Sequence, residues 1–196
     1  MSLLQRFALL FSVYTWFTLV CGVPSFDGIT FWSSDTGSIV PGMSALEALG
    51  PNNNYENGHY MPRFLTLSGE RGAPGNATVK TVLGRTPPPL FYIHNSQLWQ
   101  YHNASTILPV NVHNSTLSSQ LPLQMIAGKK RDGVKGGSWR WQGTQLVYEQ
   151  GKSNNGGVYY SCQDTNGLMG VFLFMRPSPT PQGCTIFTIH SFVRDH

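Results

Sequence analysis

The chain has 196 residues, of which 40% are hydrophobic and 12% aromatic, and its formal net charge at pH 7 is +4. Charged residues make up only 11% of the sequence, against about 25% in ordinary soluble domains. The chain is long enough to bury a real core, and its weak basic charge argues against nucleic acid as a partner.

The N-terminus predicts a secretory signal peptide, residues 1–22. Arg6 precedes an uncharged apolar run over residues 7–20, whose roughly 14 residues suit a signal peptide and are fewer than the ~20 of a membrane span. We expect cleavage after Gly22; an uncleaved membrane anchor is the alternative. Residues 23–196 then form a single secreted domain of 196 − 22 = 174 residues, outside the cell or in the cell wall and free of the membrane.

Two cysteines remain after signal cleavage. Cys21 leaves with the signal peptide, so Cys162 and Cys184 form an even pair in an oxidising compartment. They predict one disulfide bond, which the chain-entropy model values at roughly 3 kcal/mol. The count also excludes a cysteine-based zinc site.

Three sequons predict N-glycosylation in a eukaryotic secretory pathway. The acceptors are Asn76, Asn103 and Asn114, each followed two positions later by Ser or Thr and none by proline. Glycans at these positions would require exposed loops or turns.

The first elements in chain order are a strand, a helix and a loop. Residues 28–33 predict a strand rich in aromatic and β-branched residues. Ser44 and Glu47 have the spacing of a capping box, and Gly50-Pro51 is a stop signal. We therefore expect one short surface helix over residues 44–50, and then a polar loop over residues 52–61.

Short strands account for the rest of the chain. Residues 93–101 and 141–149 resemble each other, and both predict a hairpin whose Asn or Gly adopts positive φ. Other strands are expected at residues 64–68, 77–83, 106–112, 123–127, 158–162, 171–175 and 185–189. About ten to twelve strands with almost no helix predict a single-domain antiparallel β-sandwich or closed barrel. A β-trefoil is the alternative.

The order of several motifs is similar to that of a known family. These motifs are the signal peptide, Thr36-Gly37-Ser38, the sequons, a hairpin at residues 92–102 and a cysteine-containing arrangement over residues 146–184. In this the chain resembles the fungal secreted cell-wall proteins of the PhiA type, which take part in phialide development. The resemblance implies a non-enzymatic glycoprotein of the cell wall. The chain differs from that family in lacking cysteines in the N-terminal half of the mature protein.

No catalytic signature is present. The sequence has no Gly-x-Ser-x-Gly elbow and no His-Glu-x-x-His helix. A secreted hydrolase would have to pair a histidine with a carboxylate; the candidates are His59, His94, His102, His113, His190, His196, Glu56, Glu149 and Asp164. His94 and His102 could face each other across a hairpin, but two imidazoles do not complete a metal site. We expect no enzyme activity, no metal and no cofactor.

Carbohydrate binding is the main alternative function. Several rings lie on expected strands, among them Trp99 and Tyr101, and a row of exposed rings can hold a sugar chain. Trp139 and Trp141 share one face of a strand, which we expect to be interior. The outward candidates for sugar contact are then Tyr148 and Tyr159.

One basic cluster occurs, at residues 129–135. Lys130-Arg131 could be a processing site or could bind acidic polymers, but an exposed loop turning at Asp132-Gly133 is the simpler interpretation. Together these observations predict a secreted structural glycoprotein of a fungal wall or extracellular matrix, with cell-wall polysaccharide as a possible partner. They leave its oligomeric state open.

Overall fold

The computed structural model describes residues 43–50, 55–56, 59–81, 87–114, 122–163 and 167–191. All of them belong to one compact unit, Asp35–His196. The expected signal peptide and the strand expected at residues 28–33 lie outside the described residues.

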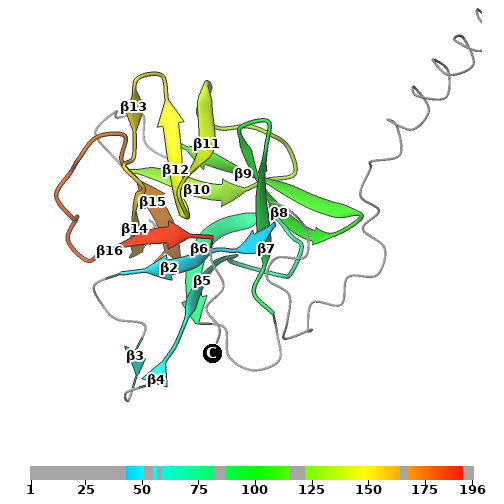
Figure 1. Cartoon of the computed structure of the whole chain (residues 1–196), viewed down its shortest axis with the longest axis horizontal. Coiled ribbons are helices and arrows are strands. Elements are labelled where there is room, and N and C mark those ends of the chain that lie inside the picture. Colours follow the sequence, from blue (N-terminus) through cyan, green and yellow to red (C-terminus); the bar gives the residue numbers. More distant parts are fainter. Residues whose placement is uncertain are drawn as a thin grey trace, which may run out of the picture. The chain divides into compact units, whose positions relative to one another are not determined.

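The regular structure of the described residues is entirely β-strand, which confirms the predicted all-β class (Figure 1). The strands are β1 (Ser44–Ala45), β2 (Glu47–Leu49), β3 (Tyr55–Glu56), β4 (His59–Tyr60), β5 (Arg63–Leu67), β6 (Gly75–Thr81), β7 (Leu90–His94), β8 (Gln97–Asn103), β9 (Thr106–His113), β10 (Leu123–Ala127), β11 (Gly137–Gln142), β12 (Gln145–Gln150), β13 (Ser153–Asn154), β14 (Val158–Gln163), β15 (Met169–Leu173) and β16 (Thr185–His190).

The main sheet is antiparallel and returns on itself. Its central path runs β10-β15-β14-β16-β2-β5-β6, and β6 pairs again with β10 at Ile126↔Asn76 and Ala127↔Gly75. Strands β15 and β6 share one edge of β10, whereas β9 pairs along the other. The path is therefore not a clean barrel, and the architecture is consistent with the expected β-sandwich.

Two hairpins extend this path. Strand β9 continues into β8 and β7, and β12 joins β16 to β11. Their turns agree with the sequence prediction, because Asn95 and Ser96 have φ of 50° and 59° and Gly143 has φ of 60°. Positive φ at the central residues matches the twist of the flanking strands.

The core lies between the inward faces of these strands. Its fully buried side chains come from segments far apart in the sequence, including Leu46, Phe91, Leu98, Leu146, Tyr159 and Ile189. Burying one such side chain is worth about 1.5–3 kcal/mol. The core therefore brings together residues from the beginning and the end of the described chain.

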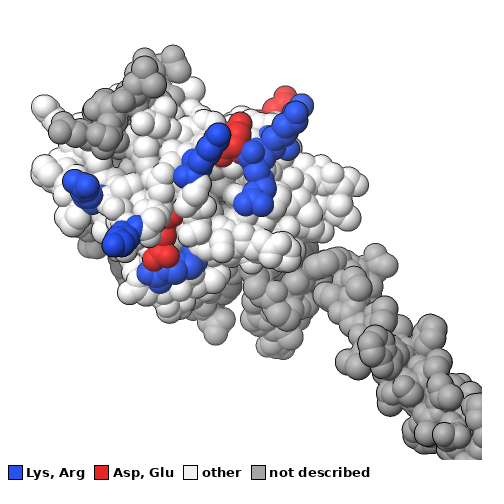
Figure 2. All heavy atoms as spheres, turned by 90° about the horizontal axis from the view of Figure 1, so that it is seen from above, with Lys and Arg blue, Asp and Glu red and all other residues white. Residues whose placement is uncertain are grey.

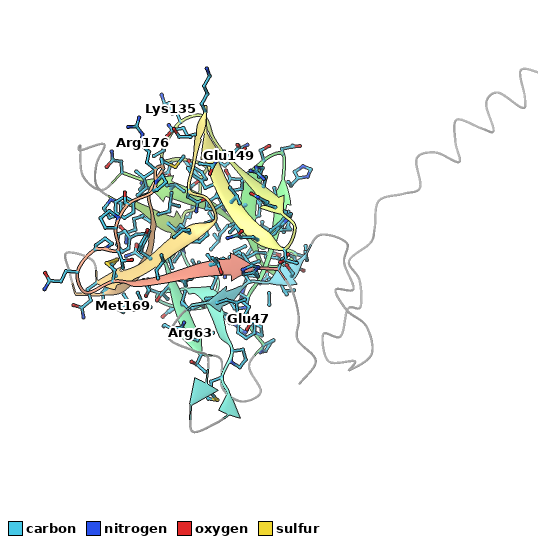
Figure 3. The ribbon with its side chains drawn as sticks, turned by 60° about the vertical axis from the view of Figure 1, so that its left-hand side comes forward. Glu47, Arg63, Lys135, Glu149, Met169 and Arg176 are labelled. Carbon is cyan, nitrogen blue, oxygen red and sulfur yellow. A yellow bond between two sulfur atoms is a disulfide. The ribbon has the colours of Figure 1, made fainter. Side chains whose placement is uncertain are left out.

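The short helix expected over residues 44–50 is wrong. Ser44–Ala45 pairs with β7, and Glu47–Leu49 pairs with β16 and β5. This pairing leaves Leu46 and Ala48 with no exposed surface and Glu47 with 1%; Figure 3 shows Glu47 lying within the sheet. A capping signal is worth about 1 kcal/mol, so the burial of two apolar side chains outweighs it.

Within the loop expected over residues 52–61, the described residues 55–56 and 59–60 are strands. Strands β3 and β4 form a short antiparallel pair, Tyr55↔Tyr60 and Glu56↔His59. Such a pair alone is marginally stable.

The predicted disulfide between Cys162 and Cys184 is confirmed. Cys162 lies in β14, and Cys184 directly precedes β16. The bridge therefore closes the segment that runs from β15 through residues 174–183.

Candidate functional site

Tyr148 and Tyr159 do not lie on the surface, contrary to the prediction. They are 3% and 0% exposed. Tyr148 lies opposite Trp139 with ring centroids 4.8 Å apart, and the Tyr159 hydroxyl donates to the Leu146 carbonyl at 3.0 Å. Burial raises the pKa of Tyr148 to about 12 and raises that of Tyr159 as well. These rings form part of the core and are not available to a sugar chain.

The expectation that Trp139 and Trp141 face the interior is confirmed. Trp139 is 3% exposed, and its indole N–H donates to the Val110 carbonyl at 3.3 Å. Trp141 is partly buried and packs against the core. Tyr148 lies opposite Trp139 on the paired strand, so its side chain lies on the same interior face.

A different set of aromatic residues lies on the outward face of β7, β8 and β9. The register places Tyr92 opposite Trp99 and places Leu90 opposite Tyr101, which in turn lies opposite Ile107. We call these five residues the aromatic face. The alternate residues of the same strands, Phe91, Leu98 and Val110 among them, are buried in the core.

The rings of the aromatic face are held at regular spacing. Side chains directly opposite each other on paired strands have Cβ atoms about 5 Å apart, and residues two apart along a strand are separated by about 7 Å. The Trp99 indole N–H also lies 3.4 Å from the His94 carbonyl. The three rings are half-buried and Ile107 is 40% exposed. The pairing of the strands fixes the backbone positions of this row.

The basic loop over residues 128–136 borders the aromatic face. Arg131 Nε donates to Gln97 Oε1 at 3.2 Å, and Gln97 lies two positions before Trp99 on the same strand face. Asn111 Nδ2 donates to the Lys130 carbonyl at 2.9 Å and to Asp132 Oδ1 at 3.0 Å. Through Gln97, these bonds connect the exposed Arg131 to the strand that carries Trp99 and Tyr101.

The same bonds hold the loop in place. Besides the contacts of Lys130 and Asp132 with Asn111, Val134 N–H donates to the Val112 carbonyl at 2.7 Å. The loop with Lys130-Arg131 is exposed, as expected, and hydrogen bonds to Asn111 and Val112 connect it to β9. Processing at this dibasic pair stays a prediction.

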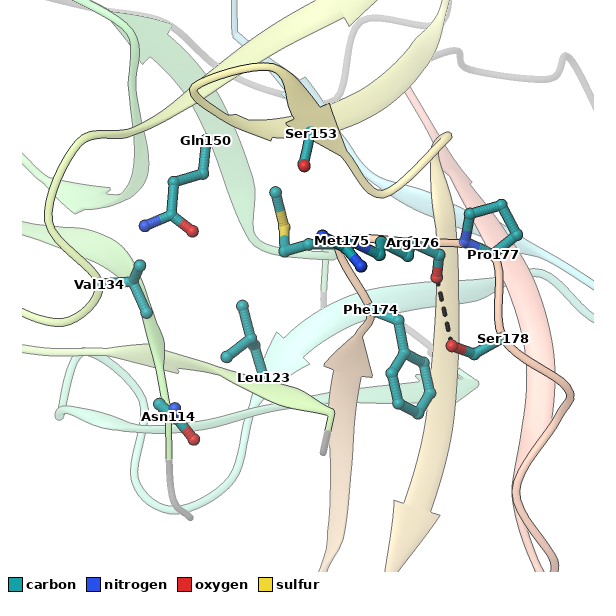
Figure 4. Close-up of a pocket in the computed structure, with 10 residues that line it drawn as sticks. All are labelled: Asn114, Leu123, Val134, Gln150, Ser153, Phe174, Met175, Arg176, Pro177 and Ser178. Carbon is teal, nitrogen blue, oxygen red and sulfur yellow. Dashed lines mark hydrogen bonds between the residues drawn. The ribbon is translucent and has the colours of Figure 1, made fainter. Parts of the chain in front are cut away.

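A cavity of about 610 Å³ lies elsewhere on the unit (Figure 4). Phe174, Met175, Arg176 and Ser178 form one wall, and Gln150 and Ser153 contribute an amide and a hydroxyl from the region of β12 and β13. The Tyr160 hydroxyl donates to the Ser178 carbonyl at 3.1 Å. The disulfide holds the segment that carries this wall.

The three predicted glycosylation sites differ in their surroundings. Asn103 is exposed at the end of β8, next to the turn into β9, and its Oδ1 accepts from Ser105 N–H at 2.9 Å. Asn114 is exposed at the end of β9 and lines the cavity. Asn76 lies within β6, paired with Ile126 and half-buried. The first two fit the expected exposure better than the third.

The histidines of the described residues form no group that resembles a hydrolase centre in the cavity. His113 Nε2 lies 2.8 Å from Asp132 Oδ1 on the surface loop, and His190 contacts the hydroxyls of Thr144 and Thr188 at 3.0 and 2.9 Å. His94 pairs with Gln97, so it does not face His102 across the hairpin. No group of three His, Cys, Asp or Glu side chains in these parts of the chain could hold a metal ion.

Four of the remaining candidates lie wholly or in part outside the described residues. His196 and Asp164 lie outside the described residues, as do the side chains of His59 and Glu56. Glu149 forms an ion pair with Arg140 on the β11–β12 hairpin.

Comparisons with protein-family models, with curated proteins and with solved structures found no match for this chain. The resemblance to PhiA-type proteins therefore stays a prediction. Within the described part of the chain, no helix has the length and apolar character needed to cross a membrane.

The sequence alone places Trp99 and Tyr101 on expected strands, but nothing in it singles out these two rings or Tyr92 for sugar contact. The available signal was the alternation of Trp99 and Tyr101 with Leu98 and Gln100. It was ambiguous because both faces of β7 and β8 carry apolar side chains. Only the pairing of neighbouring strands distinguishes the core face from the outward one.

Proposed function

We propose that this protein is a secreted, non-enzymatic glycoprotein with a structural role in a fungal cell wall or extracellular matrix, held there by polysaccharide bound on the aromatic face. The observation that carries the proposal is the row of Tyr92, Trp99 and Tyr101 on one outward sheet face. The PhiA-type resemblance supports the location, and the aromatic face supports the mode of attachment.

The chemistry of the aromatic face suits a sugar chain. The apolar C–H faces of pyranose rings pack on aromatic rings, and such rings supply large contact areas with little loss of conformational entropy. The exposed guanidinium of Arg131, held beside Trp99 through Gln97, supplies hydrogen-bond donors for sugar hydroxyls. Preorganised rings on paired strands reduce the entropic cost of binding.

The weak charge of the molecule predicts how binding should respond to salt. Figure 2 shows charged side chains as scattered groups on a face that is otherwise uncharged. Contacts made by rings and neutral hydroxyls are not screened by ions. We therefore expect retention on polysaccharide to survive high salt and to yield to a soluble oligosaccharide.

The test is a pull-down of the secreted mature protein on insoluble chitin, β-glucan and cellulose, eluted with salt and then with soluble oligosaccharide. We expect Trp99→Ala to weaken retention about tenfold, which corresponds to ~1.4 kcal/mol, and Tyr101→Ala to weaken it by a similar factor. Met169→Ala is the matched control, because Met169 is also an exposed apolar residue, at 44%, but lies on β15.

Circular dichroism first shows that each variant is folded, so that a change in retention reports on binding. Loss of retention in the Trp99 and Tyr101 variants alone supports the aromatic face as the attachment site. Retention that is absent on every polymer, or equal in all variants, would contradict it.

A further inference from the structure

The cavity beside Phe174 has a sequon asparagine in its wall. Asn114 is exposed, starts Asn114-Ser115-Thr116 and lines the cavity together with the residues of the β15–β16 segment. Figure 4 shows Asn114 at the edge of the cavity, next to Val134 and Leu123. A glycan attached to its Nδ2 would begin at the cavity rim.

The lining of the cavity has the mixture of groups that contacts sugar. Phe174 offers a ring, which is held edge-on against Tyr160 with centroids 5.2 Å apart. Gln150 supplies an amide and Ser153 a hydroxyl, and Arg176 supplies an exposed guanidinium at the wall (Figures 3 and 4). Its volume of about 610 Å³ falls within the range of about 300–1,000 Å³ that is typical of small-molecule sites.

We propose that this cavity holds the first sugars of the glycan attached to Asn114. The proposal depends on secretion through a glycosylating pathway and does not depend on polysaccharide binding by the aromatic face. The attached glycan has an advantage over a free sugar, because a short covalent link gives it an effective concentration in the millimolar range. Contacts too weak to retain a free saccharide are then sufficient.

The docked glycan would join parts of the fold that are distant in sequence. Asn114 follows β9, Gln150 and Ser153 flank the turn from β12 to β13, and Phe174 and Arg176 follow β15. Sugar bound between them would cover the apolar side chains of the cavity and restrain the segment that the disulfide closes.

Asn103 provides a matched control within the same chain. It begins a sequon of the same kind and is exposed at the end of β8, and it is not among the residues that line the cavity. A glycan on Asn103 should be as accessible to a glycosidase in the native protein as in the unfolded one.

The experiment uses the full chain secreted from a glycosylating eukaryotic host. Site-resolved mass spectrometry measures how fast a peptide-N-glycosidase releases each glycan, first from native and then from denatured protein. We expect native release at Asn114 to be at least tenfold slower than at Asn103, and the two rates to converge on denaturation.

Two variants test whether the cavity causes this protection. Arg176→Ala removes an exposed side chain and should raise the native release rate at Asn114 severalfold without changing that at Asn103. Ser153→Trp should fill the cavity and have the same effect. An unmodified Asn114, equal native rates at the two sites, or rates unchanged in folded Arg176→Ala would overturn the proposal.

Discussion

At the scale of single residues, Asn155 organises the turn that connects β13 to β14. Its Oδ1 accepts from Tyr148 N–H at 2.9 Å and from Gly157 N–H at 3.1 Å, and its Nδ2 donates to the Val158 carbonyl at 3.1 Å. The side chain is 6% exposed. These bonds satisfy backbone groups that have little access to water, so Asn155 links the β12 strand to the following turn.

We expect Asn155→Ala to lower the free energy of unfolding by about 2–4 kcal/mol, because it leaves buried backbone donors without their acceptor. Equilibrium denaturation in urea measures the change. Asn154→Ala is the control, since Asn154 accepts a single bond, from Gly156 N–H, at an exposed site; it should cost less than about 1 kcal/mol. An equal decrease in the free energy of unfolding in the two variants would show that the buried hydrogen bonds of Asn155 contribute no more than the exposed bond of Asn154.

At the scale of elements, the β7–β8 hairpin carries four of the five residues of the aromatic face, including its three rings. Its turn places two non-glycine residues, Asn95 and Ser96, at positive φ. Asn tolerates this conformation better than Ser does. In the β11–β12 hairpin, by contrast, Gly143 occupies the turn.

Ser96→Gly should therefore raise the free energy of unfolding by about 0.5 kcal/mol, because relief of the left-handed strain exceeds the added entropy of the unfolded chain. The Ser96 carbonyl still accepts from Trp139 N–H, at 2.8 Å in the native protein. Chemical denaturation measures the gain, and polysaccharide retention should not change. A loss of stability would mean that the serine side chain contributes to the native turn.

At the scale of the whole molecule, buried tyrosines couple folding to alkaline pH. Burial raises the pKa of Tyr148 from its ordinary value of 10.0 to about 12, and it raises the pKa of Tyr159 further in the same direction. Below pH 10 both hydroxyls are protonated in the folded and unfolded states. Above it the unfolded chain loses these protons first, so stability falls as pH rises from 10 toward 12.

Tyr148→Phe should make that loss of stability shallower, because the variant has one fewer group that ionises only on unfolding. Denaturant midpoints measured between pH 8 and pH 12 test this prediction. Wild type and variant should run parallel up to pH 10 and diverge above it. Parallel curves over the whole range would contradict the assignment of Tyr148 to the buried, protonated state.

The sequence by itself determined the all-β class, the two hairpins at Asn95-Ser96 and Gly143, and the pairing of Cys162 with Cys184. Each depends on a local or countable property: alternation along a strand, a residue that tolerates positive φ, or an even number of cysteines. Such signals do not depend on which segments lie next to each other.

Only the tertiary structure decided the conformation of residues 44–49, the interior position of Tyr148 and Tyr159, and the outward position of Tyr92, Trp99 and Tyr101. The physical reason is the same in each case. Strands with apolar side chains on both faces have no intrinsic inside, and a short segment with helical caps becomes a strand when neighbouring strands bury its side chains. Contacts distant in sequence therefore choose the buried face, and that choice places the aromatic face on the surface.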